Sequence, residues 1–273
     1  MSEKIKRTIT SIFYFILIIS VVIINKYEYT LCFVFLQAVC AIYEIFNVAD
    51  LKKSVLKYFG YLVCLTYFLS GMFFKNTHKY LKDIILITFL FSVIYTILRN
   101  KKVNFKEFVF SNFTYIYIPF LLSFIPEMFN LKYGNILYLF LMFTVMSTDA
   151  CAYIVGSKFG KNKLISISPK KSVEGSLGGT IASIITIFLT YLVFAKINII
   201  NQADINIYLL ILFTFILSIL SQFGDLIASY IKRYFNKKDY GKILMGHGGI
   251  LDRIDSLILT APIAYLLFKT FLI

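Results

Sequence analysis

Charged residues are scarce in this chain, and acidic residues are the scarcer kind. Asp and Glu number 14 against 28 Lys and Arg, and charged residues of both signs fill 15% of the 273 positions. Hydrophobic residues fill 59%, and the mean hydropathy is +0.79. A soluble domain of this length could not bury that much apolar surface, so the composition excludes a soluble globular protein.

Cysteine and proline are also rare, with four of each. No two cysteines form a C-x-x-C pair, and each lies in an apolar run, which argues against a redox or metal set and favours small buried residues. There is no Pro-rich linker, low-complexity tract or clear internal repeat. We therefore expect one integral domain.

Long apolar runs recur along the whole chain, each close to the length of about 20 residues that crosses a bilayer as a helix. The first run follows the basic start MSEKIKR without a cleavage motif, so we expect it to be retained. The sequence predicts an all-α polytopic integral membrane protein with about nine transmembrane helices, at residues 8–25, 29–47, 58–74, 83–98, 108–125, 135–155, 177–195, 206–228 and 257–272.

The basic residues predict the orientation, because short loops rich in Lys and Arg stay in the cytoplasm. Nine spans with the N-terminus in the cytoplasm and the C-terminus outside put basic residues on the inner side in a three-to-one ratio. These loops facing anionic headgroups explain the net charge of +14, so we expect no nucleic-acid partner. We expect a multi-pass protein of the cell (inner) membrane. A homodimer is compatible with this class but is not required by the sequence.

Three acids fall within or at the edge of predicted spans, where ionisable groups are costly and mark functional sites. They are Glu44, Asp149 and Asp225, all towards the predicted cytoplasmic ends. Most of the polar chemistry lies in the C-terminal half. We therefore divide the chain into residues 1–107, helices whose role stays open together with that of Glu44, and residues 108–273, the catalytic region.

The loop at 156–179 contains SPKKSVEG, with Ser168, Lys170 and Lys171 ahead of a helix start. Lysines beside the backbone N–H groups of a helix start can bind phosphate. A basic inner loop that only follows the positive-inside rule is the simpler interpretation of these residues alone.

The segment at 221–256 is more informative. Ser221, Asp225 and Ser229 follow one another at i, i+4 and i+8, so a continuous helix places them on one face, with Lys232 one turn beyond. A carboxylate beside hydroxyls and a lysine suits a hard cation bound to phosphate oxygens. Asp252 and Asp255, at i and i+3, share a face at the start of the last span.

Simpler roles remain open for the residues of this last motif. Asp252 and Asp255 could cap a helix, and Gly248 and Gly249 could break the chain before it. His247 could be a turn residue, since one histidine without a second ligand is a poor metal site. The combination of all these features beside Asp225 in an apolar chain favours a functional site.

The stretch SYIKRYFNKKDYGKILMGHGGILDRID resembles the signature of the phosphatidate cytidylyltransferase (CDP-diacylglycerol synthase) family, and SPKKSVEGSLGG and DACAYIVG resemble two further blocks of it. The chain departs from the family pattern at Met245, where a proline is usual, and at Ser172 and Val173. No charged group is lost at these positions. The signature positions are Ser229, Lys232, Arg233, Lys238, Asp239, Gly241, His247, Gly248, Gly249, Asp252, Arg253 and Asp255.

The resemblance implies a nucleotidyltransferase that converts CTP and phosphatidate to CDP-diacylglycerol and pyrophosphate in phospholipid synthesis, with the site on the cytoplasmic side. Asp225 and Asp252 are the expected Mg²⁺ ligands, with a second cation as an open alternative, and Asp255 assists. The other expected catalytic residues are Lys232, Arg233 and His247. The expected substrate-binding residues are Asp149, Ser168, Lys170, Lys171, Ser221, Ser229, Lys238, Asp239, Gly248, Gly249 and Arg253.

Two alternatives stay open. A lipid kinase that uses CTP to phosphorylate a polyprenol or phytol would release CDP rather than pyrophosphate. An ion-coupled transporter would place its acids near the bilayer midplane between related halves. The sequence shows no such repeat, and its acids cluster towards one side.

Overall fold

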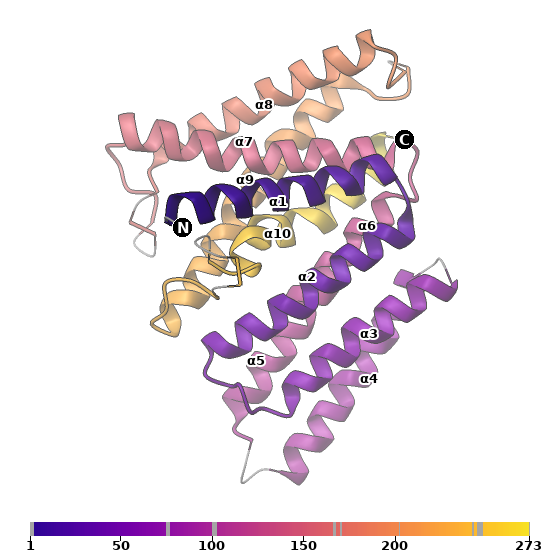
Figure 1. The fold of residues 1–273 in the computed structure, drawn as a ribbon, viewed down its shortest axis with the longest axis vertical. Coiled ribbons are helices and arrows are strands. Elements are labelled where there is room, and N and C mark those ends of the chain that lie inside the picture. Colours follow the sequence, from indigo (N-terminus) through magenta and orange to yellow (C-terminus); the bar gives the residue numbers. More distant parts are fainter. Residues whose placement is uncertain are drawn as a thin grey trace. The chain divides into compact units, whose positions relative to one another are not determined.

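The computed structural model describes residues 3–74, 77–99, 103–165, 168–169, 171–201, 203–241, 243–244 and 248–272, with only the backbone described at 3–9, 11, 74 and 77–79. This part of the chain is helical (Figure 1), apart from turns, loops and the isolated β-bridges Lys163–Ser172 and Leu244–Gly248. The α-helices are α1 Glu3–Ile24, α2 Tyr27–Val48, α3 Leu56–Phe74, α4 Thr77–Leu98, α5 Phe105–Tyr115, α6 Phe124–Met128, α7 Gly134–Phe159, α8 Val173–Lys196, α9 Ile207–Tyr234 and α10 Leu251–Leu267. The π-helical turns are η1 Ile116–Phe120 and η2 Phe268–Leu272.

Eight described helical segments are long and apolar enough to cross a membrane. They match eight of the nine predicted spans and confirm the all-helical membrane fold. The remaining predicted span, 8–25, falls on α1, which is 22 residues long, and the part of α1 at Ile12–Ile24 is apolar.

The chain divides into two compact units. The N-terminal unit comprises Met1–Pro126 and Phe235–Arg253, and the C-terminal unit comprises Glu127–Tyr234 and Ile254–Ile273. The part of the signature between α9 and α10, residues 235–250, is called the signature loop below, and it groups with the N-terminal helices. This grouping gives residues 1–107 a structural connection to the signature.

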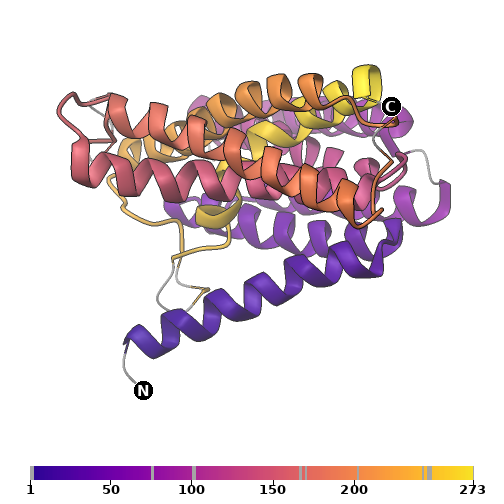
Figure 2. The same cartoon turned by 90° about the horizontal axis from the view of Figure 1, so that it is seen from above.

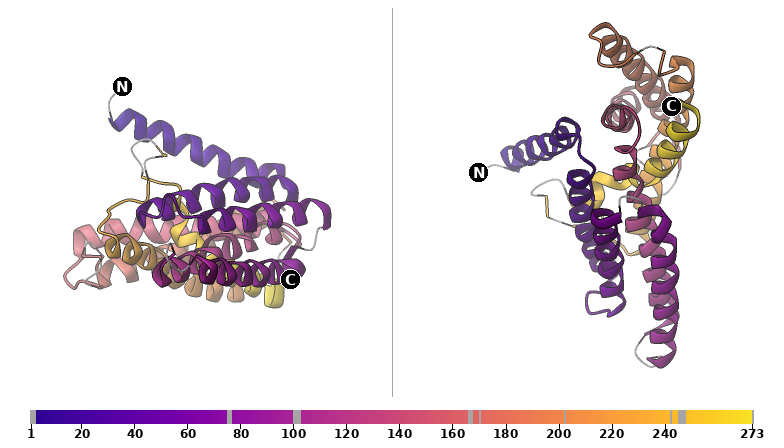
Figure 3. Two further views of the ribbon diagram at one scale, coloured as in Figure 1. Left: turned by 90° about the horizontal axis from the view of Figure 1, so that it is seen from below. Right: turned by 90° about the vertical axis from the view of Figure 1, so that its right-hand side faces the viewer.

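In the N-terminal unit, α3 packs against α2, α4 and α5 (Figure 1). A buried cluster of Tyr27, Leu31, Tyr67 and Leu81 ties α2, α3 and α4 together. Helix α1 joins α2 through a two-residue connection and then diverges from it towards its own beginning, as Figures 2 and 3 show. The two helices thus form a V that is open at the start of α1.

In the C-terminal unit, α7 and α8 pack closely along each other because α8 is glycine-rich on the facing side. A Cβ added to Gly175 would lie 2.6 Å from the carbonyl oxygen of Ala152, and one added to Gly179 would lie 2.6 Å from that of Thr148. These glycines of the SVEGSLGG block therefore allow the two helix backbones to approach. Sequence reasoning had associated this block with phosphate binding.

Polar side chains connect α7, α8 and α9 inside the same unit. Thr148 donates to Ser218, which donates to Thr180, and the amide of Gln222 also donates to Thr180. Each of these side chains is buried, so the hydrogen bonds satisfy groups that would otherwise be costly in an apolar interior. The chain of hydrogen bonds fixes the rotation of α9, on which Gln222 lies one turn before Asp225.

Candidate active site

The signature loop of the N-terminal unit is folded around the carboxylate of Asp252. The Oδ2 atom of Asp252 accepts hydrogen bonds from the backbone N–H of Gly249 at 2.8 Å and of Tyr240 at 2.9 Å. The backbone N–H of Leu244 donates to the carbonyl of Gly248 at 3.1 Å. Asp252 lies in the first turn of α10 but accepts from residues of the loop ahead of the helix, so one oxygen atom of its carboxylate orders the loop.

Gly248 has a positive φ of 81° beside this carboxylate, and an added Cβ would lie 2.8 Å from Asp252 Oδ2. Both the left-handed backbone and the close carboxylate therefore require glycine at this position.

Glu44 of α2 is the residue that sequence reasoning left without a role. Its side chain is buried, at 1% exposure, and its two oxygens accept separate hydrogen bonds at the start of α10. Oε1 accepts from the N–H of Ile250 at 3.0 Å, and Oε2 accepts from the N–H of Leu251 at 2.8 Å. A carboxylate at a helix N-terminus satisfies donors that have no partner within the helix.

Two signature glycines make room for Glu44. A Cβ added to Gly241 would lie 2.5 Å from Glu44 Oε1, and a Cβ added to Gly249 would also overlap the Glu44 carboxylate. Gly249 was expected to bind substrate. In the structure it contacts the carboxylates of both Glu44 and Asp252.

In the C-terminal unit, Lys171 and Asp225 form an ion pair. The Nζ atom of Lys171 lies 2.6 Å from Oδ2 of Asp225, and the two side chains are 24% and 30% exposed. The hydroxyl of Ser229 lies 3.4 Å from the other Asp225 oxygen, at the hydrogen-bonding limit. The predicted continuation of the helix through Ser229 is therefore confirmed, and it brings Asp225 and Ser229 to one face of α9.

The loop before α8 presents Lys171 to this pair through its own hydrogen bonds. The N–H of Lys171 donates to the carbonyl of Ser168, and its carbonyl accepts from Leu164. Ser172 caps α8 by accepting from the N–H of Gly175 at 3.1 Å. The carboxylate of Glu174 accepts from the backbone of Lys161 and Asn162, which closes the loop at its other end.

Three acids on three helices interact in this unit. Asp149 of α7, Asp225 of α9 and Asp255 of α10 lie close enough for their charges to act on one another, and we call them the acidic cluster. Lys171 lies close enough to Asp149, and Lys232 close enough to Asp255, for their opposite charges to attract. The hydroxyl of Ser256 donates to Asp149 at 3.3 Å. The cluster carries three carboxylates beside two lysines.

Gly224, immediately before Asp225, allows α9 and α10 to approach at the acidic cluster. A Cβ added there would lie 2.7 Å from the carbonyl oxygen of Asp255 and 3.0 Å from Cα of Ser256. The backbone contact explains how acids from two helices come together. The sequence analysis assigned no role to Gly224. A small residue next to an intramembrane acid is the one feature of the sequence that could have indicated this close helix contact.

The remaining predicted residues differ in their surroundings. Ser221 is fully buried and donates to the carbonyl of Ser218 in its own helix. Ser168 is half-buried, whereas Arg233, Lys238, Asp239 and Arg253 are exposed. Lys170 and His247 lie outside the described residues. Asp225 and Asp252 belong to different units, so their pairing as metal ligands stays a prediction.

A second ion pair of the C-terminal unit is formed by Lys132, ahead of α7, and Asp204, ahead of α9. Its atoms are 2.8 Å apart. The hydrogen bond to Lys132 lowers the pKa of Asp204, and the same bond raises the pKa of Lys132, so both groups stay charged at neutral pH. Asp204 precedes the start of α9, whereas Asp225 lies in the second half of the helix, so the two ion pairs lie well apart along it.

Comparison with known proteins agrees with these features. A family model described as "Cytidylyltransferase family" matches residues 5–271. A phosphatidate cytidylyltransferase of Bacillus subtilis (strain 168) is 33% identical over 273 residues, which cover 97% of this chain and 98% of the relative. One of Staphylococcus haemolyticus is 37% identical, covering 96% and 97%, and one of Thermotoga maritima is 31% identical, covering 89% of each chain. The chain belongs to the cytidylyltransferase family.

Proposed function

We propose that this chain transfers the cytidylyl group of CTP to phosphatidate, forming CDP-diacylglycerol and pyrophosphate in phospholipid synthesis. The observation that carries the proposal is the ion pair of Lys171 and Asp225 within the acidic cluster of a family member built from membrane-spanning helices. The names of relatives that span nearly the whole chain support the same substrates.

The reaction is a displacement at phosphorus. A phosphate oxygen of phosphatidate forms a bond to the α-phosphorus of CTP, and the bond from that phosphorus to the bridging oxygen of the β-phosphate breaks. Pyrophosphate leaves with the electron pair. Because a phosphate monoester is already ionised near neutral pH, the enzyme needs no strong base, and charge neutralisation and positioning dominate.

The lysines of the C-terminal unit suit this task. Lys171 is half-buried and held by Asp225, which fixes its ammonium group beside the second half of α9. Lys232 is half-buried on α9, and its positive charge attracts the carboxylate of Asp255. We infer that both lysines neutralise phosphate charge, and the hydroxyl of Ser229 adds a donor beside Asp225. Lys170, Arg233 and His247 remain predicted contributors.

The carboxylates of the candidate site are ligands of the kind that Mg²⁺ prefers. This ion usually binds one or two carboxylates together with substrate phosphates. Within the described residues, no group of three or more His, Cys, Asp or Glu side chains could hold a metal ion by itself. A magnesium ion would thus need substrate oxygens, with Asp225 and, as predicted from the sequence, Asp252 as its protein ligands. When bound, it would polarise the α-phosphate and stabilise the pyrophosphate. A second cation stays part of the hypothesis.

We infer a place in the cell (inner) membrane with the site on the cytoplasmic side, the N-terminus inside and the C-terminus outside. The basic inner loops support this orientation, since Lys171 and Lys232 belong to the predicted inner segments. Accessibility of single introduced cysteines to an impermeant maleimide in intact cells tests it. Homodimer formation stays a prediction, to be tested by the mass of the detergent-solubilised protein.

The function is tested in membranes from cells that express the chain, incubated with CTP and phosphatidate. CDP-diacylglycerol and pyrophosphate are the expected products, and they are expected to disappear with Asp225→Asn at equal expression. Release of CDP with a newly phosphorylated isoprenoid alcohol would favour a lipid kinase. Solute uptake by proteoliposomes without CTP turnover would favour a transporter.

A further inference from the structure

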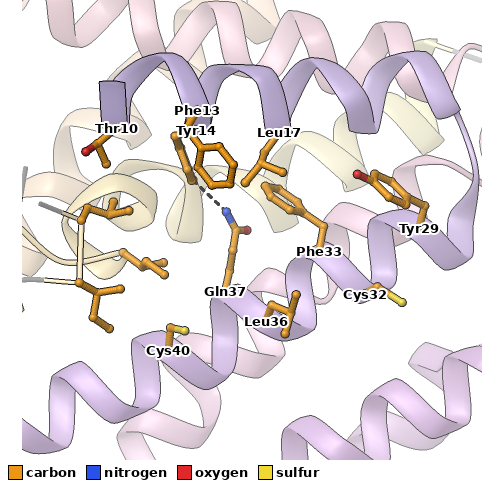
Figure 4. Close-up of a pocket in the computed structure, with 13 residues that line it drawn as sticks. Thr10, Phe13, Tyr14, Leu17, Tyr29, Cys32, Phe33, Leu36, Gln37 and Cys40 are labelled. Atoms are coloured by element: carbon orange, nitrogen blue, oxygen red, sulfur yellow. Dashed lines mark hydrogen bonds between the residues drawn. The ribbon is translucent and has the colours of Figure 1, made fainter. Parts of the chain in front are cut away.

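A cavity of about 550 Å³ lies between α1, α2 and the signature loop, all within the N-terminal unit (Figure 4). Its lining is mostly apolar, with Leu17 from α1, Phe33 and Leu36 from α2, and Leu244 and Ile250 from the loop. The cavity fills part of the V between the two diverging helices. We call it the α1–α2 groove.

One polar atom in the groove, Oε1 of Gln37, has no hydrogen-bond partner among the described residues. Gln37 is 5% exposed and lines the groove, and its Nε2 donates to the hydroxyl of Tyr14 at 2.8 Å. Its Oε1 is buried without a hydrogen-bond partner and faces the space between α1 and α2 (Figure 4). Such an atom is costly to bury, so a ligand that hydrogen-bonds to the Gln37 amide would be stabilised here.

The Gln37 amide can serve a ligand in either orientation. The Tyr14 hydroxyl can accept or donate, so the amide can turn over, with Oε1 accepting from Tyr14 and Nε2 facing the groove. In that orientation Gln37 offers an N–H donor. An ester carbonyl with an apolar chain attached matches one donor in an apolar channel.

The groove has two different ends. Figure 4 shows Tyr29 towards one end and Thr10 towards the other. Near Tyr29 the helices are joined, because Ser20 of α1 and Tyr29 of α2 share a hydrogen bond of 2.9 Å. From Gln37 to Tyr29, α2 rises about 12 Å, enough for much of an extended acyl chain.

The opposite end is continuous with the signature. Ile250, which lines the groove, is the residue whose N–H is held by Glu44, and Leu244 bonds to Gly248. In the sequence, the basic residues Lys4, Lys6 and Arg7 precede Thr10, and basic segments of this kind attract anionic headgroups.

We propose that the α1–α2 groove binds one acyl chain of the phosphatidate substrate, with its ester at Gln37 and its phosphate towards the signature loop. The inference deepens the proposed function and rests on it for the identity of the lipid. The groove then explains why helices of the N-terminal unit accompany the signature loop: they position the lipid for a reaction on its headgroup.

The direct test uses the unmodified protein in nanodiscs and a phosphatidate with a photoreactive diazirine in one acyl chain. Crosslinks located by peptide mass spectrometry are expected in residues 10–17 and 29–40. Unlabelled phosphatidate is expected to compete, whereas phosphatidylethanolamine with the same chains is not. Crosslinks confined to other helices would overturn the proposal. Equal competition by both lipids would also overturn it and would identify a general lipid site.

A kinetic test uses Leu36→Trp to fill the groove, with Leu62→Trp as the matched control. Both leucines are largely exposed residues of the same unit, and Leu62 does not line the groove. Leu36→Trp is expected to raise KM for long-chain phosphatidate about tenfold, with KM for CTP unchanged, since it removes lipid binding alone. Equal kinetic constants for the two variants would contradict the binding of an acyl chain in the α1–α2 groove.

The outcome separates this inference from the proposed function. If the wild-type protein forms CDP-diacylglycerol while crosslinks avoid the groove, the groove inference fails and the function stands. If no CDP-diacylglycerol forms, the proposed function fails, whatever the crosslinks show. Should Leu36→Trp not fold, the crosslinking result on the unmodified protein still decides.

Discussion

Glu44 and Leu251 are 207 positions apart in the sequence, and a 2.8 Å hydrogen bond joins the Glu44 carboxylate to the Leu251 backbone N–H. The other carboxylate oxygen holds Ile250. Through these two bonds, α2 fixes the start of α10 and with it the position of Asp252. A residue from the helices whose role was open thus orders the signature loop.

Glu44→Gln is expected to lower both stability and activity. An amide has only one oxygen, so one of the two buried N–H donors would face an NH₂ group and lose its acceptor, at a cost of about 1–3 kcal/mol. Thermal unfolding in detergent and the rate of CDP-diacylglycerol formation are the measurements. Glu28→Gln is the matched control, because Glu28 is exposed on the same helix. Equal behaviour of the two variants would exclude the role assigned to Glu44.

Asp252→Asn separates loop ordering from metal binding. Asp252 accepts two backbone hydrogen bonds, both at Oδ2. The side-chain oxygen of an asparagine can also accept two hydrogen bonds. The variant is therefore expected to keep its thermal stability. If Asp252 is also a Mg²⁺ ligand, activity falls by about a hundredfold or more, in the range typical of electrostatic catalytic groups.

Asp252→Ala provides the comparison, since it removes both functions and is expected to lower stability as well. Near-normal activity of Asp252→Asn would show that Asp252 only orders the loop. That result would leave Asp225 as the sole predicted metal ligand.

Lys171→Gln is expected to reduce activity by at least about tenfold, because it removes a half-buried cation from the acidic cluster and leaves Asp225 without its counter-ion. Lys132→Gln is the control, since it breaks the ion pair ahead of the start of α9. Initial rates at saturating lipid and varied CTP compare the two. A larger loss with Lys132→Gln than with Lys171→Gln would refute the placement of the site.

Gly224→Ala is expected to impair activity more than Gly60→Ala. The added methyl group at position 224 meets the backbone of α10, at 2.7 Å and 3.0 Å, and backbone atoms cannot move aside. At Gly60 of α3 the nearest atoms are side-chain atoms of Ile42 and Tyr115 at 3.3 Å, which can adjust. Activity normalised to folded protein is the readout. Unimpaired Gly224→Ala enzyme would mean that the approach of α9 and α10 is not required.

The sequence predicted the helices well because apolar runs of spanning length carry a strong signal. Eight of the nine predicted spans correspond to described helices that are long and apolar enough to cross a membrane, and the first falls on α1. The shared face of Asp225 and Ser229 followed from helical spacing and was confirmed.

Other features depend on contacts between segments far apart in the chain. Spacing could not reveal that Glu44 reaches Ile250, or that Lys171 from one loop pairs with Asp225 of another helix. The structural role of two glycines could not be predicted from the sequence either. Gly175 and Gly179 fit a phosphate-loop pattern by sequence, but the carbonyl groups of α7 that exclude a Cβ there are visible only in three dimensions.

The position of the label transferred from CTP tests the central claim most directly. Membranes containing the chain are given Mg²⁺, phosphatidate and CTP that is radiolabelled either in the α-phosphate or in the γ-phosphate. The α-label is expected to enter the lipid fraction as CDP-diacylglycerol, and the γ-label is expected to leave as pyrophosphate. Entry of the γ-label into lipid, with release of CDP, would contradict the proposed cytidylyl transfer.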